Sequence, residues 1–140
     1  MKHPDRRSDA RERALYLLYE AQAKEISPVD ALEVQIVEPD ELTATLVHGV
    51  VDHRAELDSA IEAKATGWSL ARMPVLDLNV LRLAAFELAH RPDVPVAVVI
   101  NEAVELAKRF STDNSGRFVN GVLSALAPEL RVETPDTGSA

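Results

Sequence analysis

The longest predominantly apolar stretch of the chain is VLDLNVLRLAAFELA, residues 75–89. On a helical wheel its apolar residues point in nearly every direction, which is the pattern of a helix that is buried on all sides. The stretch is too short to span a bilayer as a helix, so other segments of the protein must cover it. Four polar residues interrupt it, and each needs the surface or a partner because an unpaired buried charge is costly: Asp77, Asn79, Arg82 and Glu87.

Amphipathic segments on both sides predict further helices around this centre. Before the centre we expect a helix over about Asp9–Lys24 with Ser8 as N-cap, a second from Ser27-Pro28 to Ile36, and a third from Glu38–Glu41 onward. After it we expect a helix over Val96–Phe110 and a last one over Gly116–Leu126, which Ser115 caps and Pro128 ends. The third of these either continues through Ile61 or breaks near His53. Gly121 lies inside the last helix, where we expect it to permit close packing.

Together these segments predict an all-α fold, a single-domain bundle of about seven helices around the central one. The run VPVAVVI at 94–100 has strand-like residues, but strong helix formers follow it and a lone strand would have nothing to pair with.

We divide the chain of 140 residues into a basic N-terminal arm (1–8), a helical domain (9–127) and a disordered tail (128–140).

Composition indicates an ordinary globular protein with no membrane partner. There is no apolar run of membrane-spanning length, no signal-peptide pattern and no cysteine, so we expect a cytoplasmic location without disulfides or thiolate metal sites.

Motifs for catalysis are lacking. The chain has no glycine-rich phosphate loop, no Gly-x-Ser-x-Gly elbow and no His-Glu-x-x-His. His48 and His53 are separated by about 140° around a helix and do not converge on a metal. Glu102 and Glu105 share a face, but Arg109 lies four residues beyond Glu105, which favours a salt-bridged surface. We therefore predict no enzyme, no catalytic or metal-binding residues and no cofactor.

Charge is unevenly distributed along the chain. The net charge is −8, yet residues 1–13 carry five basic and three acidic side chains, whereas residues 20–63 carry two basic and eleven acidic ones. Basic side chains at a helix start do not stabilise the helix, but together with the free amide groups there they favour a phosphate backbone. The candidate cations are Arg6, Arg7, Arg11 and Arg13. The alternative is a solubilising N-terminus with no ligand.

A second candidate region begins at Lys108-Arg109, continues through STDNSG and ends at Arg117-Phe118. It combines cations, small polar side chains in a flexible loop and an aromatic ring, which are the parts that bind single-stranded RNA. The alternative is that Phe118 belongs to the core and the loop is only a connection. The same alternative applies to Tyr16 and Tyr19 on the first helix.

Three motifs resemble the NusB family of transcription antitermination factors. They are Ala10-Arg11-Glu12-Arg13-Ala14 through Leu18-Tyr19, Leu81-Arg82-Leu83-Ala84 through Phe86-Glu87-Leu88, and Val94-Pro95 through Lys108 continuing to Phe118-Val119-Asn120-Gly121-Val122-Leu123. The resemblance covers about residues 9–127, and in the acidic middle it rests on the helix pattern more than on the residues.

The resemblance implies a helical, non-catalytic protein that binds the boxA element of ribosomal RNA leader transcripts together with NusE, a ribosomal protein of the small subunit. The pair would join other Nus factors on RNA polymerase and suppress premature termination. With Arg13 added by the charge argument, the expected RNA-binding residues are Arg6, Arg7, Arg11, Arg13, Tyr19, Asn114, Ser115, Arg117 and Phe118.

For NusE, the resemblance implies an acidic contact at Asp77, which we expect to be an exposed acid on the otherwise buried helix. Two departures from the family concern the RNA surface. Asp5 and Asp9 dilute the basic arm, and Asn114 stands where an aspartate is common. The rival hypothesis is a helical interaction module, or a homodimer, without RNA specificity.

Overall fold

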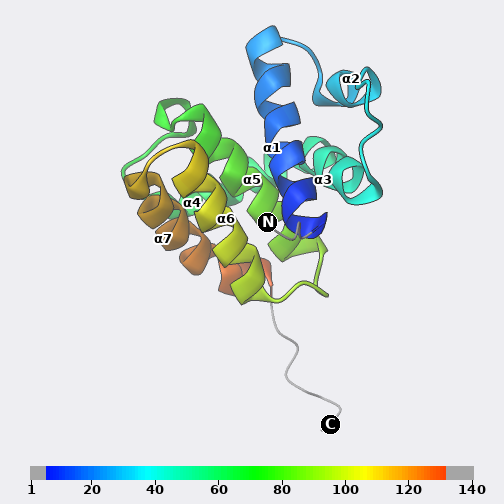
Figure 1. Cartoon of the computed structure of the whole chain (residues 1–140). Coiled ribbons are helices and arrows are strands. Elements are labelled where there is room, and N and C mark those ends of the chain that lie inside the picture. The colour runs from blue at the N-terminus through cyan, green and yellow to red at the C-terminus, as the bar shows by residue number, and fades with distance from the viewer. Residues whose placement is uncertain (1–5, 132–140) are drawn as a thin grey trace, which may run out of the picture.

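A computed structural model describes residues 6–131, apart from the side chain of Arg6. In that range it contains seven α-helices, one short 3-10 helix and no strand, which confirms the predicted all-α class. In chain order the elements are α1 (Arg6–Lys24), α2 (Pro28–Glu33), α3 (Glu41–Asp52), α4 (Arg54–Lys64), η1 (Leu70–Arg72), α5 (Val75–His90), α6 (Val96–Phe110) and α7 (Asp113–Leu130) (Figure 1). The rest of the predicted arm and tail, residues 1–5 and 132–140, lies outside the described residues.

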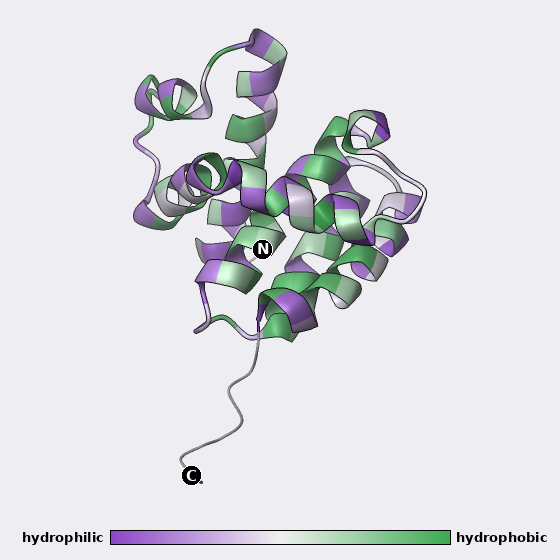
Figure 2. Cartoon of the chain, turned by 180° about the vertical axis from the view of Figure 1, so that it is seen from behind, coloured by the Kyte–Doolittle hydropathy of each residue, from purple (hydrophilic) through white to green (hydrophobic). Residues whose placement is uncertain are grey.

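Helix α5 runs through the middle of the molecule. Helices α1, α2 and α3 gather on one side of it and α4, α6 and α7 on the other (Figure 1). Seen from behind, the outer helices carry polar and apolar residues on different sides, as amphipathic helices do (Figure 2).

The predicted central helix is confirmed. Every residue from Asp77 to Leu88 is buried, including all four polar residues of the stretch. Among the described residues, no helix has both the length and the apolarity to cross a membrane.

Several predicted helix ends need correction. Helix α1 begins at Arg6, so Ser8 lies within the helix instead of capping it. Helix α2 starts where Ser27 caps it, as expected, but ends at Glu33. The chain breaks at His53, between α3 and α4, which decides the alternative that the sequence left open.

The prediction of a polar loop from Ser111 to Gly116 before the last helix is also wrong. Thr112 accepts a hydrogen bond from the Ser115 amide at 3.0 Å and caps α7, so only two residues, Ser111 and Thr112, separate α6 from α7. At the other end α7 continues past Pro128 to Leu130. A proline in the last turn removes one hydrogen bond, and the buried Leu126 and Ala127 hold this turn on the core.

Close helix contact occurs at a glycine that the sequence did not single out. A methyl group on Gly49 in α3 would lie 2.2 Å from the Phe86 ring of α5, so only glycine fits there. The expectation for Gly121 is wrong, because it is exposed and a methyl group there would have no neighbour within 4 Å.

We predict opposite effects of alanine at these two glycines. Gly49→Ala should destabilise the protein by about 1–3 kcal/mol, because Phe86 must leave its place. Gly121→Ala should stabilise it by about 0.5–1 kcal/mol, because alanine has the higher helix propensity. Urea unfolding followed by circular dichroism measures both, and similar effects of the two substitutions would contradict the packing of α3 on α5.

Candidate nucleic-acid interface

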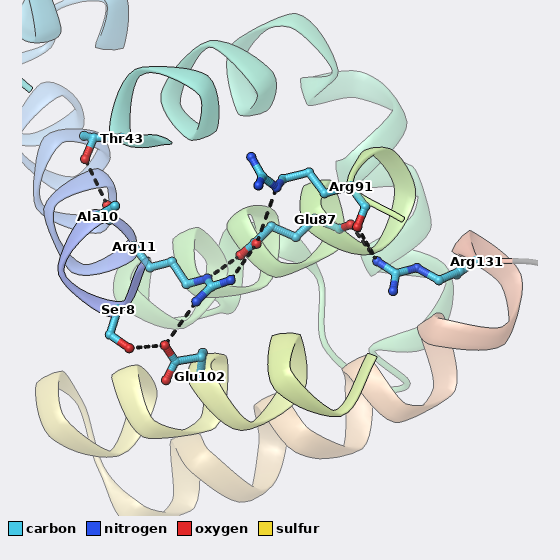
Figure 3. A network of polar contacts seen from close by, with 8 residues as sticks. All are labelled: Ser8, Ala10, Arg11, Thr43, Glu87, Arg91, Glu102 and Arg131. Carbon is cyan, nitrogen blue, oxygen red and sulfur yellow. Dashed lines mark hydrogen bonds and ion pairs between the residues drawn. The ribbon is translucent and has the colours of Figure 1, made fainter. Parts of the chain in front are cut away.

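Arg11, the central cation of the predicted RNA surface, lies inside the protein. Only 4% of it is exposed, and it forms two hydrogen bonds to the Glu87 carboxylate, from Nε at 2.7 Å and from Nη2 at 2.9 Å. Its Nη1 donates to Glu102 at 3.1 Å, and Ser8 donates to the same carboxylate oxygen (Figure 3). These contacts join α1 to α5 and α6.

The environment keeps Arg11 charged. Burial by itself lowers the pKa of the guanidinium, but the hydrogen bonds and the negative charge of Glu87, with a contribution from Glu102, raise that pKa above its ordinary value. The predicted contact between Arg11 and RNA therefore needs correction. Its donors are committed to two carboxylates, and it is a structural residue in this fold.

The other arginines at the start of the chain point in different directions. Arg13 donates to the backbone carbonyls of Val37 and Glu38, so it fastens the α2–α3 connection to α1. Arg7 is exposed and lines a surface depression with Asp40 and Glu41. The side chain of Arg6 is outside the described residues. The predicted arginine cluster is thus dispersed over different neighbours.

Ser115 and Asp77, predicted for RNA and for NusE respectively, contact each other. Ser115 Oγ donates to Asp77 Oδ2 at 2.9 Å, and both residues are buried, Asp77 with 3% of its surface exposed. The expectation of an exposed acid at Asp77 is therefore wrong. The pair holds the first turn of α7 against the first turn of α5, where the positive end of the α7 dipole faces the carboxylate.

The remaining candidates lie at the surface near the start of α7. Asn114 and Arg117 are both exposed, one turn apart, and Arg117 donates to Asn114 Oδ1. Phe118 is partly buried against the core, and its ring lies 5.9 Å from that of Trp68, which is 48% exposed. Trp68 comes from the connection between α4 and η1, so two distant parts of the chain form one aromatic surface.

Helix α1 reaches this region through α6. Ser8 meets Glu102, Glu12 pairs with Arg109 at 3.0 Å, and the Tyr16 ring meets the Phe110 ring edge-on at 5.6 Å. The two helices therefore run in the same direction, and α6 ends two residues before α7 begins. It is the later turns of α1, rather than its basic start, that approach the α6–α7 connection.

We call the surface formed in this way the aromatic–cation strip. It has two parts, which the short α6–α7 connection joins along the chain. One part is formed by Tyr16 and Tyr19 on α1 with Lys108, Arg109 and Phe110 at the end of α6, and the other by Asn114, Arg117 and Phe118 at the start of α7 with Trp68. Arg109 lies over the Phe110 ring, 4.9 Å from its centre, so cation and aromatic groups alternate there. The strip offers cations for phosphates and ring faces for bases.

Sequence reasoning missed Trp68 as a member of this surface. The signal was present, because a tryptophan within the polar loop Thr66-Gly67-Trp68-Ser69 has no helical face on which to be buried. A core position was the alternative left open for the two tyrosines of α1, of which Tyr19 was predicted to bind RNA, and both are exposed, Tyr16 to 56% and Tyr19 to 44%.

Known proteins resemble this chain over most of its length. The NusB family model matches residues 8–128. The transcription antitermination protein NusB of Anaeromyxobacter dehalogenans is 51% identical over 132 residues, which cover 89% of this chain and 92% of that protein. That of Saccharopolyspora erythraea is 49% identical over 127 residues, which cover 86% of each.

Solved structures share the fold. T. maritima NusB superposes with a TM-score of 0.80 at 34% identity, covering 92% of this chain and 94% of that one. A chain from a crystal structure of the antitermination factors NusB and NusE in complex with dsRNA superposes with a TM-score of 0.76 at 29% identity, covering 89% of this chain and 97% of that one.

We predict that Arg11 contributes to stability through its charge. Arg11→Met should cost about 3–5 kcal/mol, because it removes both hydrogen bonds from the buried Glu87 carboxylate and leaves it only Arg91, at 3.9 Å. Adding Glu87→Met should recover most of that loss, since both charges are then gone. Chemical unfolding of the single and double variants tests this.

Arg13→Met on the same helix is the matched control. Its hydrogen bonds are exposed, so it should cost less than about 1 kcal/mol. If the Arg11 and Arg13 variants lost equal stability, the buried pair would not have the role assigned to it.

Proposed function

Because this chain belongs to the NusB family of transcription antitermination factors, we propose that its aromatic–cation strip binds single-stranded RNA. Two sets of contacts carry the proposal. The end of α6 meets α1 through Tyr16–Phe110 and Glu12–Arg109, and the start of α7, two residues further along the chain, meets Trp68 through Phe118. Cations alone would bind any polyanion, whereas the interleaved rings favour unpaired bases that can stack on them.

Each part of the strip has a role in this proposal. Arg117 and Lys108 bind phosphates, and Arg109, which is paired with Glu12 at 3.0 Å, adds a third cation when it exchanges that partner for a phosphate. Trp68 offers a ring face for a base, and Phe118 supports it from the core side. Asn114 is close enough to Arg117 to present its amide to a base edge.

The arm adds a second contact at the far end of α1. Tyr16 and Arg7 are separated by nine residues of helix, which is about 14 Å along the axis. The same nine residues turn about 180° around the helix, so Arg7 faces the α3 side, and an RNA reaches it only by crossing over the start of α1. Arg11 and Ser115 support the surface from below, and Arg13 does so by holding the neighbouring connection in place.

We further propose that the RNA is the boxA element of ribosomal RNA leader transcripts and that NusE binds alongside it. A NusB with the same fold has been solved with NusE and dsRNA, which supports this pair of partners. The complex would join other Nus factors on RNA polymerase in the cytoplasm, suppress premature termination and promote ribosomal RNA synthesis.

Asp77 enters the NusE proposal as a positioning residue. Its carboxylate is buried, Oδ2 accepts from Ser115 and Oδ1 has no hydrogen-bond partner, so its effect on a partner is transmitted through the placement of α7 on α5. Loss of that carboxylate would displace the start of α7 and with it Asn114 and Arg117.

A protein-interaction module is the second candidate. Val34, Ile36 and Val37 in the α2–α3 connection are largely exposed, which is unusual for three apolar side chains so close together. Such a patch suits a protein partner or a second copy of the chain. Light scattering after size exclusion distinguishes a homodimer from a monomer at working concentrations.

We predict that two surface substitutions weaken RNA binding without affecting the fold. Arg117→Ala should lower the slope of log affinity against log salt by about 1, because one phosphate contact is lost. Trp68→Ala should weaken binding about tenfold or more, because one stacked base loses its platform, and Trp68→Phe should restore part of the affinity. Fluorescence anisotropy with labelled boxA-type RNA, with and without NusE, measures both.

The control variant is Lys64→Ala, which removes a positive charge paired with Glu129, away from the strip. It should leave RNA affinity nearly unchanged. Two outcomes would contradict the proposal and favour the interaction module. One is weak binding that is equal for boxA-type and scrambled RNA under all conditions, and the other is an equal loss of affinity in the Lys64 and Arg117 variants.

A further inference from the structure

A cluster of three metal-binding side chains lies where α3, α4 and α5 meet. His53 stands between α3 and α4, Glu56 is in the first turn of α4, and His90 is the last residue of α5. His90 Nε2 lies 2.9 Å from one oxygen of Glu56, and His53 Nδ1 lies 3.9 Å from the other. One ligand atom from each of the three residues lies within 4.8 Å of the other two.

Two imidazoles and one carboxylate form the donor set of zinc sites that keep an open position. With metal–ligand bonds of about 2.0–2.2 Å, donor atoms at adjacent corners of a tetrahedron are separated by about 3.3 Å. His90 and His53 approach different oxygens of Glu56, at 2.9 and 3.9 Å, and one ligand atom from each residue lies within 4.8 Å of the other two, which is wider than that value. Binding therefore requires the three side chains to close around the ion.

The surroundings leave the cluster available to a cation. The two arginines next to it in sequence are directed elsewhere, since Arg54 lies 3.6 Å from Asp58 and Arg91 lies 3.9 Å from Glu87. The carbonyl ends of α3 and α5 meet here and their dipoles favour positive charge, whereas the amide end of α4, which begins at Arg54, opposes it, so two of the three helix ends favour a cation. All three side chains are partly or fully open to solvent, so an ion has a path of entry.

The two histidine rings are stacked in this structure. Their centres are 3.9 Å apart with 23° between the ring planes, and the Phe86 ring lies under both, 5.9 Å from His53 and 5.5 Å from His90. Lone pairs of imidazole nitrogens lie in the ring plane, so two parallel rings do not aim at one ion. One ring must turn about its Cβ–Cγ bond, which breaks the stack and is a signature of binding.

From this geometry we propose that His53, Glu56 and His90 bind one Zn²⁺ or a similar borderline divalent ion, with water completing its coordination. The ion joins the α3–α4 corner to the end of α5. Its role is structural, because it links three elements that otherwise meet there through ring contacts and the hydrogen bond between His90 and Glu56. The site uses none of the residues of the aromatic–cation strip, so it stands independently of the proposed function.

The test is a zinc titration of the full-length chain without an affinity tag. All variants carry His3→Asn, because His3 lies outside the described residues and could supply a ligand of its own. Competition with a chromogenic chelator gives the stoichiometry and affinity, and thermal unfolding gives the linked stabilisation. We expect one equivalent of Zn²⁺, no comparable binding of Mg²⁺, and a rise in Tm of roughly 5–10 °C at a hundredfold excess over Kd.

Three substitutions assign the ligands, and one controls for histidine content. His53→Asn, His90→Asn and Glu56→Gln should each weaken zinc binding by about tenfold or more. His48→Asn should change it by less than about twofold, because His48 is exposed on α3 outside the cluster.

In the wild type, the imidazole carbon-bound proton signals of His53 and His90 should shift together in NMR spectra as the stack opens.

Two results would overturn the proposal. One is the absence of stoichiometric zinc binding. The other is a pattern of dispersed surface binding. In that case zinc binding survives in His53→Asn and His90→Asn, or His48→Asn weakens it as much as those two substitutions do.

Discussion

The pairing of Arg11 with Glu87 is the constraint on which the rest of the arrangement depends. Helix α5 is buried along most of its length, yet it carries two acids, an arginine and an asparagine. A buried charge without a partner costs several kcal/mol, so each charge on α5 requires a partner on a neighbouring helix. Glu87 is paired with α1, Arg82 is hydrogen-bonded to Asp58 of α4 at 2.8 and 3.1 Å, and Asp77 is bonded to Ser115 of α7. These contacts fix the position of three outer helices along one central helix.

This arrangement determines which side chains remain for a ligand. Because Arg11 and Glu102 join α1 to α6, the next turns bring Glu12 to Arg109 and Tyr16 to Phe110. Because Asp77 holds the first turn of α7, the neighbouring Asn114 and Arg117 are presented at the surface beside Trp68 and Phe118. Buried polar contacts thus position an exposed surface that they do not form themselves. A substitution at Arg11 or Asp77 alters this surface indirectly.

The sequence was sufficient for the fold class and the central helix, because apolar residues all around a helix have one explanation in a chain of this kind. It also held a signal for Arg11, which precedes the buried Ala14 and Leu18 by three and seven residues and therefore shares their inward face. Its partner Glu87 is 76 residues away, however, and no local pattern specifies such a pair. For the same reason the sequence did not indicate the contact of Ser115 with Asp77 or that of Trp68 with Phe118. The helix cap at Thr112 is a local feature, but the sequence pattern predicted it at Ser115.

The most direct test of this account is an NMR comparison of arginine side chains with and without boxA-type RNA. We expect the Arg11 Nε–H signal to exchange slowly with solvent in the free protein and to keep its position when RNA binds. The Arg117 Nε–H signal should shift on binding. An Arg11 signal that exchanges rapidly or shifts more than that of Arg117 would contradict the division between buried support and exposed binding surface.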